Sequence, residues 1–378
     1  MAVTTYAVGD ALTAKRYARG LEVEALMATE VAPLIGEDAD SIIHLRNEMK
    51  KEKGDRVTFG LRTKLTGAGR TEGQTLEGNE ESLTTYSDSL LLNELSHAVR
   101  VKGENTIDNQ RILFNTRQEA KNGLKDWFAE RMAIGFFLHV CGYTGASYTH
   151  RGLTVDGALA VYNLGNTITA PTTSRKIFAA AGSGESNTTD QALESDDVFD
   201  LRLIDYAKEL ARTSSVPLRP VMIEGAEHFV CYLHPYQVVD LRTSTDTGQW
   251  MDFSKTAYTG LGKNNPIFTG ALGMYNGVVL RESENVTPGA NSSTLATIST
   301  VRRAVFLGAQ AAMMGMGTNF NPPSRGAPGS AFKWVEETFD YQRELGVSAQ
   351  SLLGLKKPVF NSLDFGAITI STYAAAHT

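Results

Sequence analysis

The sequence has few cysteines and is not basic. Two cysteines, Cys141 and Cys231, stand among 378 residues, which is too few for a disulfide framework, and they are not in metal-site spacing. We therefore expect both thiols to be buried, apolar and reduced. The formal net charge of −6 argues against a dedicated nucleic-acid-binding protein, whose domain would be basic. Any contact with nucleic acid is then expected to be local.

Long apolar runs are also missing. The N-terminus, MAVTTYAVGDALTAKRY, lacks the apolar core of a secretory signal. The least charged stretches, Met132–Tyr143 and Ala304–Thr318, are shorter than the ~18–20 residues that cross a bilayer. The sequence thus predicts a soluble, cytosolic product that does not contact a membrane.

No motif for catalysis, metal binding or cofactor binding survives inspection. Asp246–Gly248 spells the short aspartic-protease signature, but it occurs once and its flanks are polar. Gly260–Lys263 fails as a phosphate loop, because Ala257 replaces the first glycine and Asn264 replaces the magnesium-binding Ser or Thr. The histidines form no i, i+4 pair. We therefore expect no cofactor, no metal and no enzymatic activity, although a site assembled from residues far apart in sequence would leave no such motif.

The most informative feature that is present is a long polar loop, Thr66–Ser82, between two strand-like stretches. It holds four glycines, five charged residues and one sizeable apolar side chain, Leu76, so it can bury almost nothing within its own subunit. A hairpin arm of this kind predicts contact with another copy of the protein. Before the loop, period-two alternation places Val57, Phe59, Leu61 and Leu65 on one strand face and Arg56, Thr58, Arg62 and Lys64 on the other, and after it the strand pattern returns through Leu91, Leu95, Val99 and Val101.

The strongest predicted helix is Thr116–Val140, which at about 1.5 Å per residue is roughly 37 Å long. Its apolar stripe is Ala120, Leu124, Trp127, Phe128, Ile134 and Leu138, and its solvent side is Arg117, Glu119, Lys121, Lys125, Asp126, Glu130 and Arg131.

Other elements alternate without a regular βαβ rhythm, so the predicted fold class is α+β. Helices are expected over residues 14–35, from a Ser195 cap to Arg212, and from Pro235 onward. Residues Gly142–Ser195 are polar and are interpreted as a second excursion or an irregular subdomain. Strands are expected at Pro220–Glu224, His228–Leu233, Val278–Arg281 after an Asn276–Gly277 turn, Phe332–Tyr341 and Ala367–Tyr373, with a further apolar element over residues 301–317.

A charged stretch, RNEMKKEKGDR, precedes the first strand. Its cations Arg46, Lys50, Lys51 and Lys53 belong either to a solvated face or to an interior surface that faces a polyanion.

This order of elements resembles the major capsid proteins of tailed double-stranded DNA bacteriophages. Three stretches, Gly54–Gly103, His234–Ala257 and Asn264–Val286, resemble a capsid branch seen in short-tailed phages of the N-four type. The resemblance implies the α+β capsid fold that tailed phages share with encapsulins and herpesvirus shells. The implied parts are an N-terminal arm (1–50), an extended loop with flanking strands (51–103), a peripheral domain with a spine helix and polar excursion (104–199), a mainly axial domain (200–325) and C-terminal strands returning to the peripheral domain (326–378).

The resemblance also implies a function. It implies a structural major capsid protein that assembles into hexamers and pentamers of an icosahedral shell around the phage genome, located in the virion and, during assembly, in the host cytoplasm. The implied partners are further copies of the chain, a separate scaffolding protein, a portal protein and non-specifically bound double-stranded DNA, with a decoration or cement protein left open. The expected contacts between subunits are Arg62, Lys64, Arg70, Glu72, Leu76, Glu77, Glu80 and Glu81, and the basic residues expected on an inner surface are Arg46, Lys50, Lys51 and Lys53.

Two departures and two alternatives qualify the resemblance. Some relatives cross-link through a lysine on the extended loop, but Thr66–Ser82 contains none, so covalent cross-linking is not carried over. Some carry a cleaved N-terminal scaffolding segment, which this sequence is not expected to have. The alternatives are an encapsulin-like compartment shell and, from another class, a metabolic α+β enzyme with a site dispersed through Gly142–Ser195.

Overall fold

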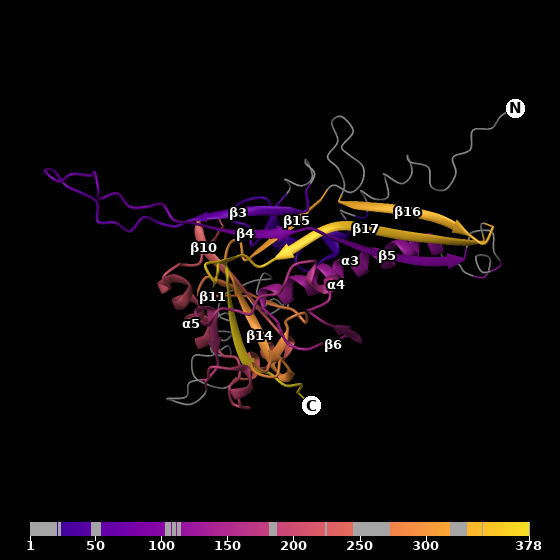
Figure 1. Cartoon of the computed structure of the whole chain (residues 1–378). Helices are drawn as coiled ribbons and strands as arrows, with labels where there is room; N and C mark the ends of the chain where they lie inside the picture. The colour runs from indigo at the N-terminus through magenta and orange to yellow at the C-terminus, as the bar shows by residue number, and fades with distance from the viewer. Residues whose placement is uncertain are drawn as a thin grey trace.

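The computed structural model of the chain describes residues 21, 24–46, 54–102, 107, 111, 115–180, 187–223, 225–244, 273–317, 331–341 and 343–377. These residues form two large sheets, one long helix and several short elements (Figure 1), which confirms the predicted α+β class. None of the helices in this part of the chain is both long enough and apolar enough to cross a membrane.

The long helix α3 spans Thr116–Val140, as predicted. Its N-cap, Asn115, accepts hydrogen bonds from the backbone N–H groups of Arg117 and Gln118, which satisfies two donors that the first turn leaves free. The helix is buried on one side at first, but every residue from Met132 to Val140 is buried. The predicted apolar stripe therefore widens into an enclosed helix end.

The prediction that Arg131 lies on the solvent side of α3 is wrong. It is only 6% exposed, and its guanidinium lies over the rings of Trp127 and Tyr162, at 5.3 and 4.8 Å from the ring centroids. The aromatic faces attract the buried cation, which the helical spacing alone does not reveal.

The first sheet joins strands from distant parts of the chain. Its order is β1-β2-β15-β17-β16, and β5 also pairs with β17. The apolar side of α3 packs on this sheet, where Leu124 and Phe128 share a core with Val347 and Leu353. The strands are β1 (Ile35–Gly36), β2 (Ile43–Arg46), β5 (Asn93–Lys102), β15 (Ala312–Met316), β16 (Phe332–Phe339) and β17 (Glu344–Lys356).

The second sheet has the order β11-β12-β10-β14-β20-β8, with β13 added beside β14 and β9 beside β10. Helix α5 (Leu201–Thr213) packs on it through a core that includes Ile204, Phe229, Phe306 and Ile368. The strands are β8 (Lys176–Phe178), β9 (Val221–Ile223), β10 (Ala226–Leu233), β11 (Met274–Tyr275), β12 (Val278–Glu282), β13 (Pro288–Ala290), β14 (Thr297–Leu307) and β20 (Ala367–Tyr373).

Local signals for several elements are confirmed. Helix α6 (Pro235–Thr243) has Pro235 in its first turn and a capping box between His234 and Gln237. The Asn276–Gly277 turn joins antiparallel β11 and β12. The predicted C-terminal strands correspond to β16 and β20.

Other expectations need correction. Helix α5 starts at Leu201, and its cap is Asp200 rather than Ser195, because Asp197 instead closes a turn by accepting the N–H of Glu194. Strand β17, with 13 residues, was not predicted. A helix was predicted over residues 14–35. Its described part is helical at residue 21 and over residues 24–28, and the 3₁₀ helix η1 (Ala32–Leu34) follows around Pro33. The remaining residues of the predicted helix lie outside the described residues.

The polar excursion is irregular, as predicted, with short elements in its described part. These elements are β6 (Tyr148–His150), β7 (Leu153–Val155), α4 (Ala160–Asn163), η3 (Thr173–Arg175), β8 and η4 (Asp190–Ala192). Elements β6, β7 and α4 pack around a small core that includes Leu138, Tyr143, Val155 and Ile168, whereas β8 packs with the second sheet.

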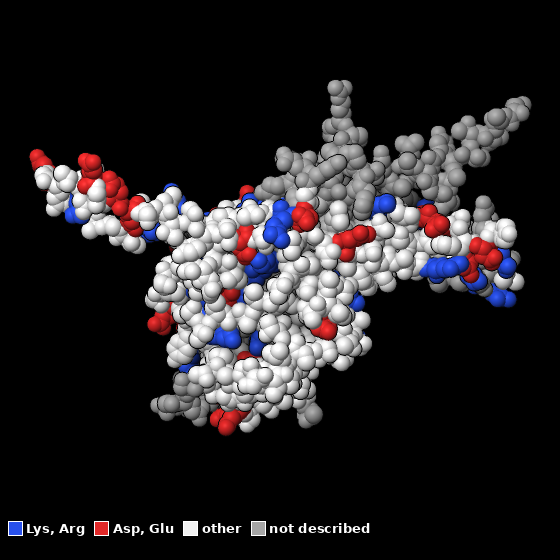
Figure 2. Space-filling model, in the orientation of Figure 1, with Lys and Arg blue, Asp and Glu red and all other residues white. Residues whose placement is uncertain are grey.

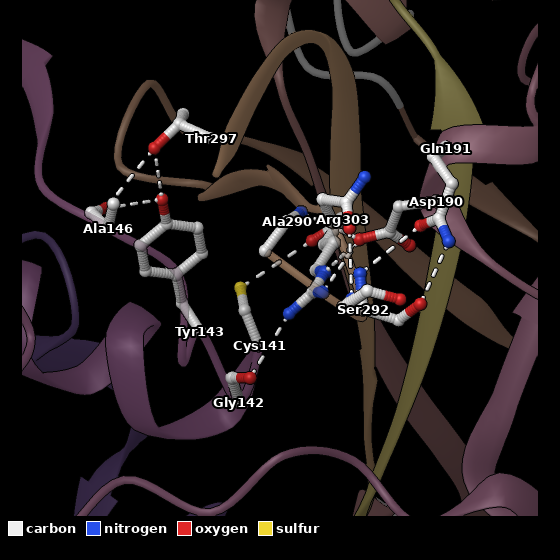
Figure 3. Close-up of polar contacts among 12 residues, drawn as sticks. Cys141, Gly142, Tyr143, Ala146, Asp190, Gln191, Ala290, Ser292, Thr297 and Arg303 are labelled. Atoms are coloured by element: carbon white, nitrogen blue, oxygen red, sulfur yellow. Dashed lines mark hydrogen bonds and ion pairs between the residues drawn. The ribbon is translucent and has the colours of Figure 1, made fainter. Parts of the chain in front are cut away.

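A buried ion pair connects the excursion to the second sheet and to the end of α3 (Figure 3). The guanidinium of Arg303 on β14 donates to Asp190 Oδ2 from Nε at 2.8 Å and from Nη2 at 2.6 Å, and Nη1 donates to the Gly142 carbonyl at 3.1 Å. The same Asp190 oxygen accepts the N–H of Ala290 at 2.9 Å. The two side chains are 7% and 4% exposed, so water does not replace these bonds. Three segments therefore meet at one charged junction.

We expect this junction to stabilise the subunit strongly. Asp190→Ala leaves the guanidinium buried without its counter-ion, so it should lower the free energy of unfolding by about 3–5 kcal/mol. Urea denaturation of unassembled subunits measures the loss. Glu227→Ala is the matched control, because its pair with Arg212 is about half exposed, at 54% and 49%, and should cost about 0–1 kcal/mol. Equal losses for the two variants would contradict the role given to the junction.

Candidate functional site

The extended arm, residues 63–84, is the most conspicuous feature outside the core. It continues from the hairpin of β3 (Arg56–Arg62) and β4 (Thr85–Leu91), whose register runs from Arg56 opposite Leu91 to Arg62 opposite Thr85. Figure 1 shows the arm projecting far from both sheets, at the left of the view. All residues from 64 to 84 are exposed, and Leu76 is 69% exposed. The arm therefore buries no apolar side chain within its own subunit.

The strand before the arm is shorter than predicted. Val57 and Phe59 are buried as expected, but β3 ends at Arg62 and Leu65 is 56% exposed. The last backbone bond in continuation of the hairpin joins the N–H of Thr63 to the carbonyl of Thr84 at 3.1 Å. Beyond it no core lies beneath the chain, so the alternation of apolar side chains has nothing to pack against.

Polar bonds hold the two chains of the arm together. The Glu81 carboxylate accepts the N–H groups of Thr66 at 2.8 Å and Gly67 at 2.6 Å, and these bonds hold the pKa of Glu81 below its usual range. Nearer the tip, Arg70 donates to Asn79 Oδ1 at 2.5 Å. The arm thus has a defined shape although it lacks a core.

The base of the arm is fixed to the body by residues far apart in sequence. Asp88 on β4 accepts hydrogen bonds from Lys356 Nζ at the end of β17 and from the Val359 N–H, the latter at 3.1 Å. The Asn166 side chain bonds both the N–H and the carbonyl of Leu91, each at 2.9 Å. An apolar cluster of Phe59, Leu90, Met313 and Phe360 lies beside these bonds. The body therefore sets the direction in which the arm leaves.

The predicted contact residues are placed as a group on this arm and its base. Arg62 ends β3, and the other seven lie on the arm, all of them exposed. Acidic side chains are spread along the arm in Figure 2. Their role between subunits stays a prediction. Arg46 ends β2, while Lys50, Lys51 and Lys53 lie outside the described residues.

Sequence reasoning missed the residues that hold the arm in place. Asp88 and Lys356 are 268 positions apart, and Asn166 and Leu91 are 75 apart. No local pattern in the sequence marks such pairs.

Both cysteines and His139 are buried. Cys141 and Cys231 are free and buried, as predicted, and burial raises the pKa of Cys231 to about 12. Burial also lowers the pKa of His139 to about 4, so this residue is neutral near pH 7. No group of three or more His, Cys, Asp or Glu side chains in the described residues is arranged to hold a metal ion.

Comparisons with known proteins agree with this geometry. A family model described as phage capsid protein matches residues 5–376. The major capsid protein of Pseudomonas phage KPP25 is 28% identical over 371 residues, covering 93% of this chain and 92% of that protein. The capsid of Ralstonia phage GP4 has a similar structure, with a TM-score of 0.73 and 28% identity, over 91% of this chain and 90% of that one.

A more distant structure supports the fold alone. The capsid asymmetric unit of cyanophage Pam1 has a TM-score of 0.71 at 21% identity, over 93% of this chain and 94% of that one. The predicted capsid fold is thereby confirmed. Because the family match spans almost the whole chain, the arm and both sheets included, the chain belongs to the phage capsid protein family and is a structural protein of the virion shell.

Proposed function

We propose that this chain is a major capsid subunit that assembles into hexamers and pentamers, which close into an icosahedral shell around double-stranded DNA. The observation that carries the proposal is the arm: all residues from 64 to 84 are exposed, yet polar bonds give it a defined shape. The arm can become buried only by contact with another molecule. In a shell that molecule would be the neighbouring subunit.

Many modest contacts suit such a shell. Each contact between copies is weak enough to break and correct an error, while a closed lattice multiplies the contacts around every subunit. The arm would lie across a neighbour with Leu76 as an apolar anchor and its charged residues at the rim, including Arg62 and Lys64 at its base. Since residues 66–82 contain no lysine, we infer that the arm holds its neighbour without a covalent bond.

The two sheets correspond to two proposed roles. The first sheet, including β15, would form the peripheral domain with α3. Most of the second sheet would form the axial domain at capsomer centres with the rest of residues 200–325. The remaining boundaries follow the expectation from the sequence: an N-terminal arm (1–50), the extended loop (51–103) and C-terminal strands (326–378).

Further partners belong to the same proposal. Assembly would take place in the host cytoplasm with a separate scaffolding protein and would include a portal protein, and a decoration protein on the outer surface is compatible with it. The basic residues Arg46, Lys50, Lys51 and Lys53 would face the packaged DNA, where cationic side chains neutralise phosphates without reading sequence.

Deleting residues 67–78 should give folded subunits that do not form shells, because the deletion removes intersubunit contacts and no core residue. Circular dichroism checks the fold, and electron microscopy with sedimentation checks assembly. A second variant with the same segment replaced by an equal length of Gly and Ser should also fail, because chain length is restored but Leu76 and the charges are not. Normal shells from the deletion variant would contradict the proposal.

The clamp at the base of the arm should matter for assembly as well. Asp88→Ala removes the acceptor for Lys356 and Val359, so the arm should leave the body in varied directions and shell yield should fall several-fold. Limited proteolysis of unassembled subunits should show faster cleavage within residues 63–84. Asp205→Ala, which removes a half-buried acceptor for Tyr275 and Asn276 at the second sheet, is the control and should leave the cleavage rate of the arm unchanged.

Neutralising Lys50, Lys51 and Lys53 with Gln should lower genome retention and leave empty-shell assembly intact, since fewer phosphates are neutralised. The DNA content of purified particles measures the effect. Glu48→Gln with Glu52→Gln is the control in the same stretch and should not lower DNA content. Unchanged packaging in the lysine variant would assign the stretch to a solvated face.

A further inference from the structure

The charges of the arm and its hairpin separate by chain direction. From Arg56 to Thr71 the outgoing chain carries four cations and no acidic residue. From Glu72 to Leu91 the returning chain carries only acidic charges, with no Lys or Arg. One side of this two-stranded ribbon is therefore cationic and the other anionic. The outgoing cations are Arg56, Arg62, Lys64 and Arg70.

These outgoing cations have no carboxylate partner among the described residues. All four are exposed, and the one side-chain hydrogen bond in the set joins Arg70 to Asn79. Most other described cations are paired; for example, Arg100 and Lys102 both contact Glu344. A row of unpaired cations on a projecting chain predicts an acidic surface on whatever the chain rests upon.

The body of the subunit carries such a surface, in the form of an open groove of about 440 Å³. It lies between α3, the segment 28–30 and the segment after β12. Five carboxylates line it against a single cation, Arg151, which is paired with Glu284 at 2.7 Å. The carboxylates are those of Glu30, Asp126, Glu130, Glu282 and Glu284.

Part of this acidity is used inside the subunit. Glu30 accepts hydrogen bonds from Ser283 Oγ at 2.9 Å and from Asn285 Nδ2 at 2.8 Å. Glu130 and Glu282, however, make no ion pair with any described residue, so their charges are free to attract a cation from outside.

A second observation also points to an outside partner. Thr29 lines the groove and is 4% exposed, but its hydroxyl has no hydrogen-bond partner among the described residues. Buried polar groups are nearly always paired, so an unpaired hydroxyl in the wall of a groove predicts a group that completes it. A metal ion does not fit, because the described residues hold no suitable ligand cluster.

We propose that the groove of one subunit receives the outgoing chain of a second copy's arm, with Arg62 and Lys64 beside Glu130 and Glu282. This rests on the proposed function, in which the arm lies across a neighbour. Residues two apart in an extended chain point to the same side, roughly 7 Å apart, so Arg62 and Lys64 together present two cations to one surface. The returning acidic chain is repelled from the same groove, which sets the orientation of the ribbon.

A charge exchange tests the pairing. Glu130→Lys with Glu282→Lys should lower shell yield at least about tenfold, since like charges then face each other across the contact. Arg62→Glu with Lys64→Glu should give a similar loss. Combining all four substitutions restores opposite charges and should return the yield to within about threefold of the parent protein. Glu209→Lys, an exposed carboxylate on α5 outside the groove, is the matched control and should leave assembly unchanged.

Shell yield is measured by sedimentation and electron microscopy, and thermal unfolding of each variant checks that the subunit folds. Arg62 and Lys64 are exposed and lie outside the core, so Arg62→Glu with Lys64→Glu should leave the thermal unfolding of the subunit unchanged. Absence of rescue, or normal yield in either charge-reversed pair, overturns the pairing. If deletion of residues 67–78 still abolishes shells in that case, the arm remains an intersubunit contact and only its receiving surface is wrong.

Discussion

The buried ion pair between Arg303 and Asp190 joins three parts of this subunit. Burying two charges costs free energy that only short, complete hydrogen bonding repays. Here the guanidinium is satisfied by Asp190 and by the carbonyl that follows α3, and Asp190 also holds Ala290 on β13. The ion pair therefore fixes the positions of three parts of the chain, at Gly142, Asp190 and Ala290. The pair keeps the second sheet, the excursion and the long helix in one fixed relative arrangement. A subunit that repeats identically through a shell requires such a fixed arrangement.

The arm, unlike the body, is not stabilised by buried side chains. It has no core, and its own bonds, such as those from Thr66 and Gly67 to Glu81, set its shape but not its direction. Direction comes from the base, where Asp88 and Leu91 are held by groups of the body. Folding of the body and the proposed contact between subunits thus depend on different residues. A subunit built in this way folds before it meets a partner and still presents a pre-oriented segment, which lowers the ordering cost of assembly.

The sequence predicts elements whose signals are local. The helical period identifies α3, a proline and a capping residue identify α6, and an Asn-Gly pair identifies the turn before β12. Strand β17 escaped because small residues such as Gly346 and Ala349 weaken its alternation, although alternate positions are buried. The anchors of the arm escaped for a different reason. Lys356 meets Asp88, and Asn166 meets Leu91, only after the sheet is assembled, so no window of sequence contains both partners.

In the proposed pairing of the arm with a neighbouring groove, charge separation along the arm governs how subunits recognise one another. Lone exposed ion pairs contribute little to affinity in water, so a single Lys64 contact would hardly select a partner. Placing only cations on the outgoing chain and only carboxylates on the returning chain changes this, because a reversed ribbon brings like charges together along its whole length. The penalty for a wrong orientation then exceeds the gain of a right one. Orientation is selected by repulsion while each correct contact stays weak and reversible, and a growing lattice needs both properties.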